Sequence, residues 1–326
     1  MTWLHRFALL VTASTLLLVT VGGLVTSTDS GLAVPDWPNT YGYFMFSFPL
    51  SKMVGGIFYE HGHRLIASTV GLMMIGLAFW ISRTDDRRWI RRLAWTALAA
   101  VVLQGTLGGI TVLYFLPAPI SVAHAGLAQI FFCLTVSLAL FTSAGWRGGI
   151  TTGADAGVTG DPTLARLAIL TPALVYVQIL IGATMRHTDA GLAIPDFPWA
   201  FGRLTPPEWS GPIAIHFAHR VGAIVVTLAI AATAGHILAH HRRSAVTRFA
   251  WLLLGLVTVQ FTLGALTVLS ERHVGINTAH VATGATLLAV SVLLGLVVHR
   301  RRFADAPEPA RVDTTAAMPA APGAMR

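Results

Sequence analysis

The chain has 326 residues, of which 54% are hydrophobic and only 11% are charged. Soluble globular proteins carry about 25% charged residues, so this composition and a mean hydropathy of +0.68 indicate a membrane protein. The formal net charge is +8, but the basic residues gather between apolar stretches, which argues against a nucleic-acid partner. Cys133 is the single cysteine, which excludes an internal disulfide and cysteine-based zinc or iron–sulfur sites.

Eight stretches are apolar and long enough to cross a bilayer, which takes about 20 residues. The first carries no charge from Phe7 to Thr28, which is too long for a signal peptide, so we expect a retained span. Residues 93–146 lack Asp, Glu, Lys and Arg, and Pro117 and Pro119 mark the turn that divides them into two helices. The expected spans are 5–27, 57–82, 92–115, 120–142, 164–185, 212–239, 246–269 and 275–298.

Arginines in the short connections set the expected orientation, because such residues favour the cytoplasmic side. They follow the second, sixth and eighth spans: Arg83, Arg87, Arg88, Arg91, Arg92, Arg242, Arg243, Arg248, Arg300, Arg301 and Arg302. We therefore expect a multi-pass protein of the cell (inner) membrane with both termini in the cytoplasm. A linker at 143–163 and a disordered Ala/Pro-rich tail at 304–326 would share that side, where His240 and His241 are expected to be solvated.

The chain contains an internal repeat. TDSGLAVPDWP at 28–38 recurs as TDAGLAIPDFP at 188–198, with eight of eleven positions identical. Three further matches are spaced by 219 − 63 = 156 residues: His63-Arg64 with His219-Arg220, Gln104 with Gln260, and His124 with His280. Each half has four spans, an even number, so both halves enter the membrane in the same sense. The predicted fold is an all-α integral membrane protein of two parallel-repeat four-helix bundles, 1–142 and 164–303.

Four histidines lie inside the expected spans, where ionisable residues are rare and usually functional. They fall near the starts of the even-numbered spans, at one depth in the outer half of the membrane: His63, His124, His219 and His280. Two imidazoles across a bundle, without a cysteine or second carboxylate, suit haem iron better than zinc. The competing interpretation is packing, in which each histidine is an interhelical hydrogen-bond partner. Duplication of all four favours ligation.

Residues beside these histidines are candidates to hold a haem. Arg64 and Arg220 could pair with propionates through bidentate forks, although arginines also extend to the membrane interface without a ligand. Nearby glycines could admit a flat macrocycle or serve helix packing: Gly62, Gly71, Gly105, Gly108 and Gly109.

The two halves differ at Glu60, whose counterpart is His216. Glu60 lies one helical turn from His63, on the same face. We expect this carboxylate to transfer protons or to stabilise a cationic intermediate. The alternative is an interface carboxylate paired with Arg64 or Lys52. His216 is expected to hydrogen-bond a propionate. The half with Glu60 is therefore the candidate for chemistry, and the other half would hold a permanent haem that passes electrons.

These residues resemble the haem A synthase family. The resemblance rests on GGLVTSTDSGLAVPDWP at 22–38 with EHGHR at 60–64, and on RHTDAGL at 186–192 with HFAHR at 216–220, and it covers about residues 5–300. It implies an oxidoreductase that acts on a CH group, oxidising the C8 methyl of haem O to a formyl group by successive hydroxylations, for cytochrome oxidase.

The resemblance also implies roles for the histidines. His63 and His124 would be the axial pair for haem O and its product haem A, with Glu60 essential beside them, and His219 and His280 would hold a prosthetic haem b. The implied partners are haem O, membrane lipid, haem O synthase and cytochrome oxidase assembly factors, with no nucleic acid and an unidentified electron donor. Some relatives carry a cysteine pair in the first outer loop, but residues 28–56 contain none.

Two other functions stay open on the sequence. A dihaem cytochrome b would only transfer electrons, and it usually places its haems on opposite sides of the membrane, unlike these histidines. A haem transporter or chaperone would bind haem exchangeably, and proline-interrupted spans would favour it. Only Pro172 lies inside an expected span.

Overall fold

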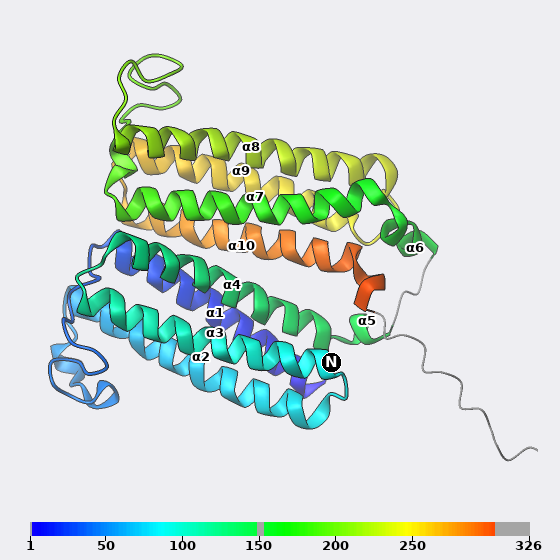
Figure 1. Cartoon of the computed structure of the whole chain (residues 1–326), viewed down its shortest axis with the longest axis horizontal. Coiled ribbons are helices and arrows are strands. Elements are labelled where there is room, and N and C mark those ends of the chain that lie inside the picture. Colours follow the sequence, from blue (N-terminus) through cyan, green and yellow to red (C-terminus); the bar gives the residue numbers. More distant parts are fainter. Residues whose placement is uncertain (1, 149–152, 304–326) are drawn as a thin grey trace, which may run out of the picture.

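The computed structural model describes residues 2–148 and 153–303. Over these residues the chain is helical and forms no β-sheet. Eight long helices run back and forth between the two ends of the molecule (Figure 1). They are α1 (Trp3–Ser27), α2 (Gly56–Thr84), α3 (Arg88–Leu113), α4 (Ala118–Thr142), α7 (Pro162–His187), α8 (Gly211–His240), α9 (Thr247–Leu269) and α10 (Val274–Val298).

These helices confirm the eight expected spans, and all eight are long and apolar enough to cross a membrane. The largest difference is at α3, which was expected from residue 92 and begins at Arg88. Pro117 is the N-cap of α4, and Pro119 lies in its first turn, where the missing N–H of a proline is tolerated. The prolines therefore separate α3 from α4 as expected.

The connections contain short helices. The linker expected at 143–163 includes α5 (Ala144–Arg147) and α6 (Gly153–Gly160), and the tail expected at 304–326 lies outside the described residues. Four 3₁₀ turns complete the elements: η1 (Met45–Ser47), η2 (Leu50–Lys52), η3 (Ala190–Leu192) and η4 (Arg300–Phe303). The two long connections, before α2 and before α8, lie at the same end of the molecule, opposite the start of α1 (Figure 1).

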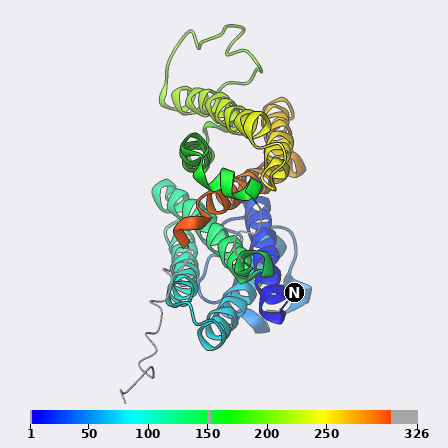
Figure 2. The same cartoon turned by 90° about the vertical axis from the view of Figure 1, so that its right-hand side faces the viewer.

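The long helices form two groups of four. In the first group, α1 and α3 each pack against both α2 and α4, so α2 and α4 lie diagonally opposite one another. In the second group, α7 and α9 each pack against both α8 and α10. The groups meet where α1 and α4 pack against α7 and α10, and Figure 2 shows the two groups side by side. The order of helix contacts is the same in both.

Large apolar side chains cover the outside of the helices. Leu72, Val102, Leu228 and Trp251 are each more than 60% exposed. Exposed apolar surface of this extent is unfavourable in water and marks a surface that meets another apolar phase. The protein is therefore a multi-pass membrane protein whose exposed helix faces contact lipid.

The end of the molecule opposite the long connections is held by Asp85, which directly follows α2. Its carboxylate accepts hydrogen bonds from Arg87 Nη2 at 2.7 Å and Arg147 Nη2 at 2.9 Å. Burial alone would raise the pKa of Asp85, but the hydrogen bonds and charge of Arg87, with the charge of Arg147, hold it below its usual value. Asp85 thus joins the α2–α3 turn to α5.

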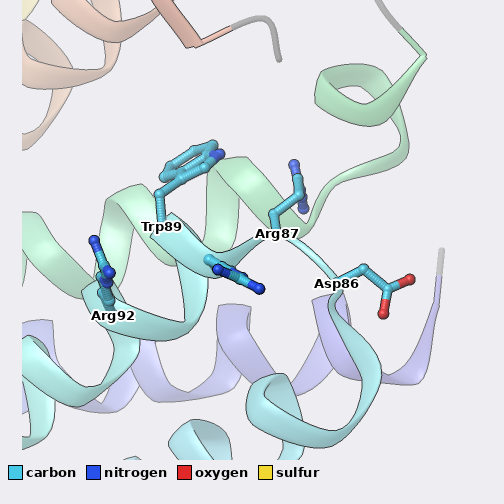
Figure 3. Close-up of a pocket in the computed structure, with 5 residues that line it drawn as sticks. Asp86, Arg87, Trp89 and Arg92 are labelled. Atoms are coloured by element: carbon cyan, nitrogen blue, oxygen red, sulfur yellow. The ribbon is translucent and has the colours of Figure 1, made fainter. Parts of the chain in front are cut away.

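The same turn packs through an aromatic contact. Figure 3 shows Trp89 directed toward α4, where its ring meets that of Phe141 edge-on with centroids 4.9 Å apart. Asp86 points away from the helices in the same view. Together with Trp89 and Arg92 it lines an open depression on the surface. The turn therefore packs through Trp89, while Asp86, Arg88 and Arg92 are exposed.

Replacing Asp85 by Asn is expected to lower the free energy of unfolding by about 1–3 kcal/mol at neutral pH, because two guanidinium groups lose their anionic partner. A depressed carboxyl pKa contributes stability that is present above the ordinary value of about 3.9 and is lost as pH falls through the folded-state value. Thermal unfolding in detergent should show the difference between wild type and variant shrinking below about pH 4. Asp86→Asn is the matched control, and a difference that stays constant with pH would contradict the assignment.

Candidate functional site

The four predicted histidines lie in the first third of α2, α4, α8 and α10. Because α2 and α4 are diagonal, His63 and His124 enter their group from opposite sides, and they are close enough to interact electrostatically. His219 and His280 do the same in the second group. Both pairs belong to the end of the molecule that carries the long connections (Figure 1).

Each histidine ring lies against a glycine on the preceding helix. A Cβ atom added to these glycines would stand 3.1, 3.0, 2.8 and 3.1 Å from a histidine Cε1 atom, for the pairs Gly22–His63, Gly108–His124, Gly182–His219 and Gly264–His280. Contacts below about 3.4 Å are tighter than ordinary carbon–carbon contact. A side chain at any of the four glycines would therefore displace the ring, so the glycines fix where the imidazoles lie.

Several ring nitrogens have no partner within the part of the chain that the structure describes. The Nδ1 atoms of His63, His124 and His280 are buried without a hydrogen bond. A buried polar group without a partner costs about 1–3 kcal/mol. Such groups in a native site are usually explained by a ligand, an ion or a water molecule.

Three glutamines that were not predicted as site residues lie beside the histidines. Gln104 Nε2 donates to the carbonyl oxygen of His124 at 2.9 Å. Gln178 Nε2 lies 3.0 Å from His219 Nδ1, and Gln260 Nε2 lies 3.3 Å from His280 Nε2. The repeated Gln104/Gln260 motif was the sequence signal for two of them. Gln178 had none, because the equivalent position, 178 − 160 = 18, is a leucine.

Glu60 is 3% exposed and joins α2 to the first long connection. Its Oε2 accepts the Val34 N–H at 2.7 Å, and its Oε1 accepts a hydrogen bond from Arg64 Nη2 at 2.6 Å. The ion pair with Arg64, one of the two alternatives from the sequence, is thus present. Lys52 instead donates to the Tyr43 hydroxyl at 2.9 Å. A role of Glu60 in proton transfer stays a prediction.

His216 occupies the equivalent place in the second group. Its Nδ1 accepts the Ile194 N–H at 3.3 Å, as Glu60 accepts that of Val34. Val34 and Ile194 are matching positions of the two long connections, since 194 − 34 = 160. Glu60 and His216 therefore share one structural task, and in the described part of the chain Glu60 differs by its ion pair with Arg64.

The two predicted arginines bind the backbone of the long connections. Arg64 donates to the carbonyl oxygens of Val34, Asp36 and Asn39. Arg220 donates to those of Ile194, Asp196 and Trp199. Their contact with propionates stays a prediction. The Nε atom of Arg220 is buried without a partner in the described chain, so one of its donors is still available.

The long connections fold alike over the two sites. The Asp36 carboxylate accepts the N–H groups of Tyr41 at 2.7 Å and Gly42 at 2.8 Å. Asp196 accepts those of Phe201 and Gly202 at 2.8 and 2.7 Å. Burial would raise the pKa of Asp36, but these backbone hydrogen bonds lower it below its usual value. Both loops are therefore closed by the same aspartate turn.

The predicted glycines have different surroundings. Gly108 supports His124, as described above, and a Cβ at Gly109 would overlap the Trp37 indole, which therefore lies directly on α3. A Cβ at Gly62, Gly71 or Gly105 would meet nothing within 4 Å. The space beside these three glycines of α2 and α3 is therefore open. Trp37, by contrast, brings the first long connection onto α3, the helix that also carries Gly108.

The residues of both pairs fit a haem. Zinc would need further nitrogen, oxygen or sulfur ligands, and the carboxylate nearest the first pair, Glu60, is occupied by Arg64 and Val34. Each pair offers two glycine-backed imidazoles on opposite helices, and Nδ1 of His63, His124 and His280 is unpaired, so these residues would suit the binding of a haem iron.

Substitution of Gly182 by Ala tests the glycine backing. We expect the Cβ to displace the His219 ring from its rotamer, at a cost of about 1 kcal/mol, and to weaken haem binding there by up to about tenfold. The measurement is haem bound per purified chain, titrated with a competing haem-binding protein. Gly71→Ala is the control, because its Cβ meets open space. Equal haem retention in the two variants would contradict the role of the glycine.

Fold and site together define a helical, multi-pass membrane protein with two equivalent histidine pairs suited to haem. The COX15-CtaA family model, described as cytochrome oxidase assembly protein, matches residues 43–292. A haem A synthase of Geobacillus kaustophilus is 30% identical over 92% of this chain and 93% of its own length. A haem A synthase of Caulobacter sp. is 30% identical over 91% of this chain and 95% of its own length. The chain belongs to this family, which confirms the resemblance seen in the sequence.

Proposed function

We propose that this protein is a haem A synthase. It is an oxidoreductase that converts the C8 methyl group of haem O into a formyl group by successive hydroxylations, for the biogenesis of cytochrome oxidase. One observation carries the proposal: two glycine-backed histidine pairs, of which only the first has a buried carboxylate, Glu60, one turn from a ligand. Membership of the family supports it.

The two pairs have different tasks in this proposal. His63 and His124 hold the substrate haem O and release the product haem A. His219 and His280 hold a prosthetic haem b, which supplies one-electron redox chemistry when bound. The glutamines support this division, since Gln178 and Gln260 lie within hydrogen-bond distance of ring nitrogens in the second pair only. Such contacts fix the orientation of ligand histidines and suit a resident group more than an exchanging substrate.

Glu60 is the candidate proton acceptor. Each hydroxylation replaces a C–H bond by C–OH and is a two-electron oxidation by an external oxidant. The second gives a gem-diol that loses water to form the formyl group, so protons must leave the reacting carbon or its hydroxyls. Glu60 is held in place by Val34 and balanced by Arg64. A positioned carboxylate can then act as a general base.

The remaining predicted residues serve binding in this proposal. Arg220 would donate its free Nε–H to a haem propionate, and Arg64 would take the matching place in the first site. His216 supports the second site by holding Ile194. Residues 1–142 would then be the substrate-haem unit and 164–303 the haem b unit.

The arginine-rich end would face the cytoplasm, by the distribution of Arg residues in short connections. Both sites would then lie in the outer half of the cell (inner) membrane, beneath the long connections. Haem O would be received from a haem O synthase, and haem A passed to cytochrome oxidase assembly factors.

Co-expression with a haem O synthase, followed by haem extraction and mass analysis, tests the function. Haem with a hydroxymethyl or formyl group at C8 should accumulate only when this protein is present. Unchanged haem O with full haem content would overturn the proposal. In that case firmly held haem would favour a dihaem electron carrier, and readily exchanged haem would favour a transporter or chaperone.

A further inference from the structure

A second cluster of potential metal ligands lies at the end of the molecule opposite the long connections. Asp161 Oδ2 lies 2.6 Å from His236 Nε2 and 2.8 Å from His241 Nε2. All three ligand atoms lie within 4.8 Å of one another. The side chains are only 11–17% exposed, so the sequence-based expectation of a solvated His241 is wrong: the turn after α8 folds it against the start of α7.

Each of the three side chains is held by contacts outside the cluster. Asp161 is the N-cap of α7, and its Oδ1 accepts the N–H groups of Thr163 and Leu164 at 2.8 and 3.0 Å. Its Oδ2 is thereby directed to the imidazoles. The ring of His236 stacks on that of His240 with centroids 4.4 Å apart. Ligands fixed in advance by such contacts lose little freedom when an ion binds.

The position of His241 is fixed by its backbone. Its carbonyl oxygen accepts hydrogen bonds from Ser244 Oγ at 2.7 Å and Thr247 Oγ1 at 2.9 Å, which close the turn between α8 and α9. The neighbouring Arg242 and Arg248 donate their Nε–H groups to the carbonyl oxygens of Leu238 and Ala245. Within the described chain, the side chains that contact the Asp161 carboxylate are the two imidazoles.

We propose that Asp161, His236 and His241 form a binding site for a divalent transition-metal ion of the zinc class. Two imidazoles and one carboxylate are a donor set that zinc and its neighbours in the first transition row prefer, whereas magnesium prefers oxygen ligands. Ligand atoms about 2.1 Å from an ion stand roughly 3.0–3.4 Å apart, so each imidazole would move about half an ångström away from the Asp161 oxygen on binding.

The bound ion would join Asp161, directly before α7, to His236 near the end of α8 and to His241 directly after α8. Three protein ligands leave at least one coordination position for water. Because the site exists only in the folded chain, the ion would stabilise the fold by an amount that grows with the logarithm of its concentration over its dissociation constant. The site is separate from both histidine pairs, so its test does not depend on the proposed enzymatic function.

Zinc binding to tag-free, haem-containing protein in detergent tests the site. The chain is treated with chelator, dialysed against Zn²⁺, and analysed for bound zinc per chain. Asp161→Asn preserves an N-cap residue but loses the charge, while His236→Gln and His241→Gln each remove a ligand. His299→Gln is the matched control, because His299 lies at the same end of the molecule and its Nδ1 contacts the Gly295 carbonyl oxygen at 2.9 Å rather than the cluster.

Wild type and His299→Gln should bind zinc saturably with equal affinity, and each ligand variant should bind at least about tenfold more weakly. Zinc should also raise the unfolding temperature of the wild type and not of the ligand variants. Unchanged haem absorption will show that the variants are folded. Equal zinc affinity in wild type and ligand variants, or binding of Mg²⁺ as tight as Zn²⁺, would overturn the proposal and leave a hydrogen-bonded cluster only.

Discussion

The variants His63→Ala and His219→Ala are expected to fail in different ways. His63→Ala should lower haem A formation by more than about a hundredfold, because the substrate loses an axial ligand, while the resident haem stays bound. His219→Ala should lose the resident haem, although the substrate site keeps both of its histidines. The physical reason is that the two pairs lie in separate groups of helices, α1–α4 and α7–α10.

Two measurements on the same membranes separate these outcomes. Absorption spectra of the purified variants report the resident haem, and mass analysis of extracted haem reports the product. His61→Gln is a matched control for His63, since His61 is buried on the same helix but its Nδ1 contacts the Thr40 hydroxyl at 3.0 Å. If His63→Ala lost the resident haem and His219→Ala kept it, the assignment of the two sites would have to be exchanged.

The membrane-spanning helices could be predicted closely because the apolar thickness of the bilayer determines both their length and their composition. A helix must present about 20 apolar residues to the bilayer, and prolines such as Pro117 restrict where the next helix begins. The histidine pairs could be predicted because the repeat places matching residues at matching depth. Neither inference needs knowledge of side-chain contacts.

The support of the histidines depends on packing and was not visible in the sequence. Gly22 and His63 are far apart in the chain, and only the contact of α1 with α2 brings them together. The arginines were predicted as site residues, but the structure gives them partners that the sequence did not indicate. Their place beside Glu60 or the histidines suggested a propionate fork, but the long connections fold back over the helices and offer carbonyl oxygens to Arg64 and Arg220. The sequence pattern does not show that the long connections fold back over the helices.

The last expected result concerns Glu60, whose structural and chemical roles can be separated. Its side chain anchors Val34 and pairs with Arg64, so Glu60→Ala would remove an anchor and leave a buried guanidinium without its anion. Loss of activity in that variant would not identify the cause, because breaking a buried ion pair alone can cost about 3–5 kcal/mol.

The second group of helices supplies a better variant. There His216 anchors Ile194, and Arg220 donates to loop carbonyl oxygens, whereas Arg64 also pairs with Glu60 on its own helix. Glu60→His copies this arrangement into the first site. We expect the variant to fold, to keep the resident haem and to bind haem O, but to form haem A about 10²–10⁴ times more slowly, the usual contribution of a general base.

Single-turnover conversion of bound haem O is the measurement, with His216→Glu as the reciprocal variant. His216→Glu should keep most of the activity, since a carboxylate can also accept the Ile194 N–H. If Glu60→His formed haem A at a rate near that of the wild type, the carboxylate would be a loop anchor, as His216 is, and the proton acceptor would have to be another group. If it failed while retaining both haems, the carboxylate itself would be required, because the anchor would still be present.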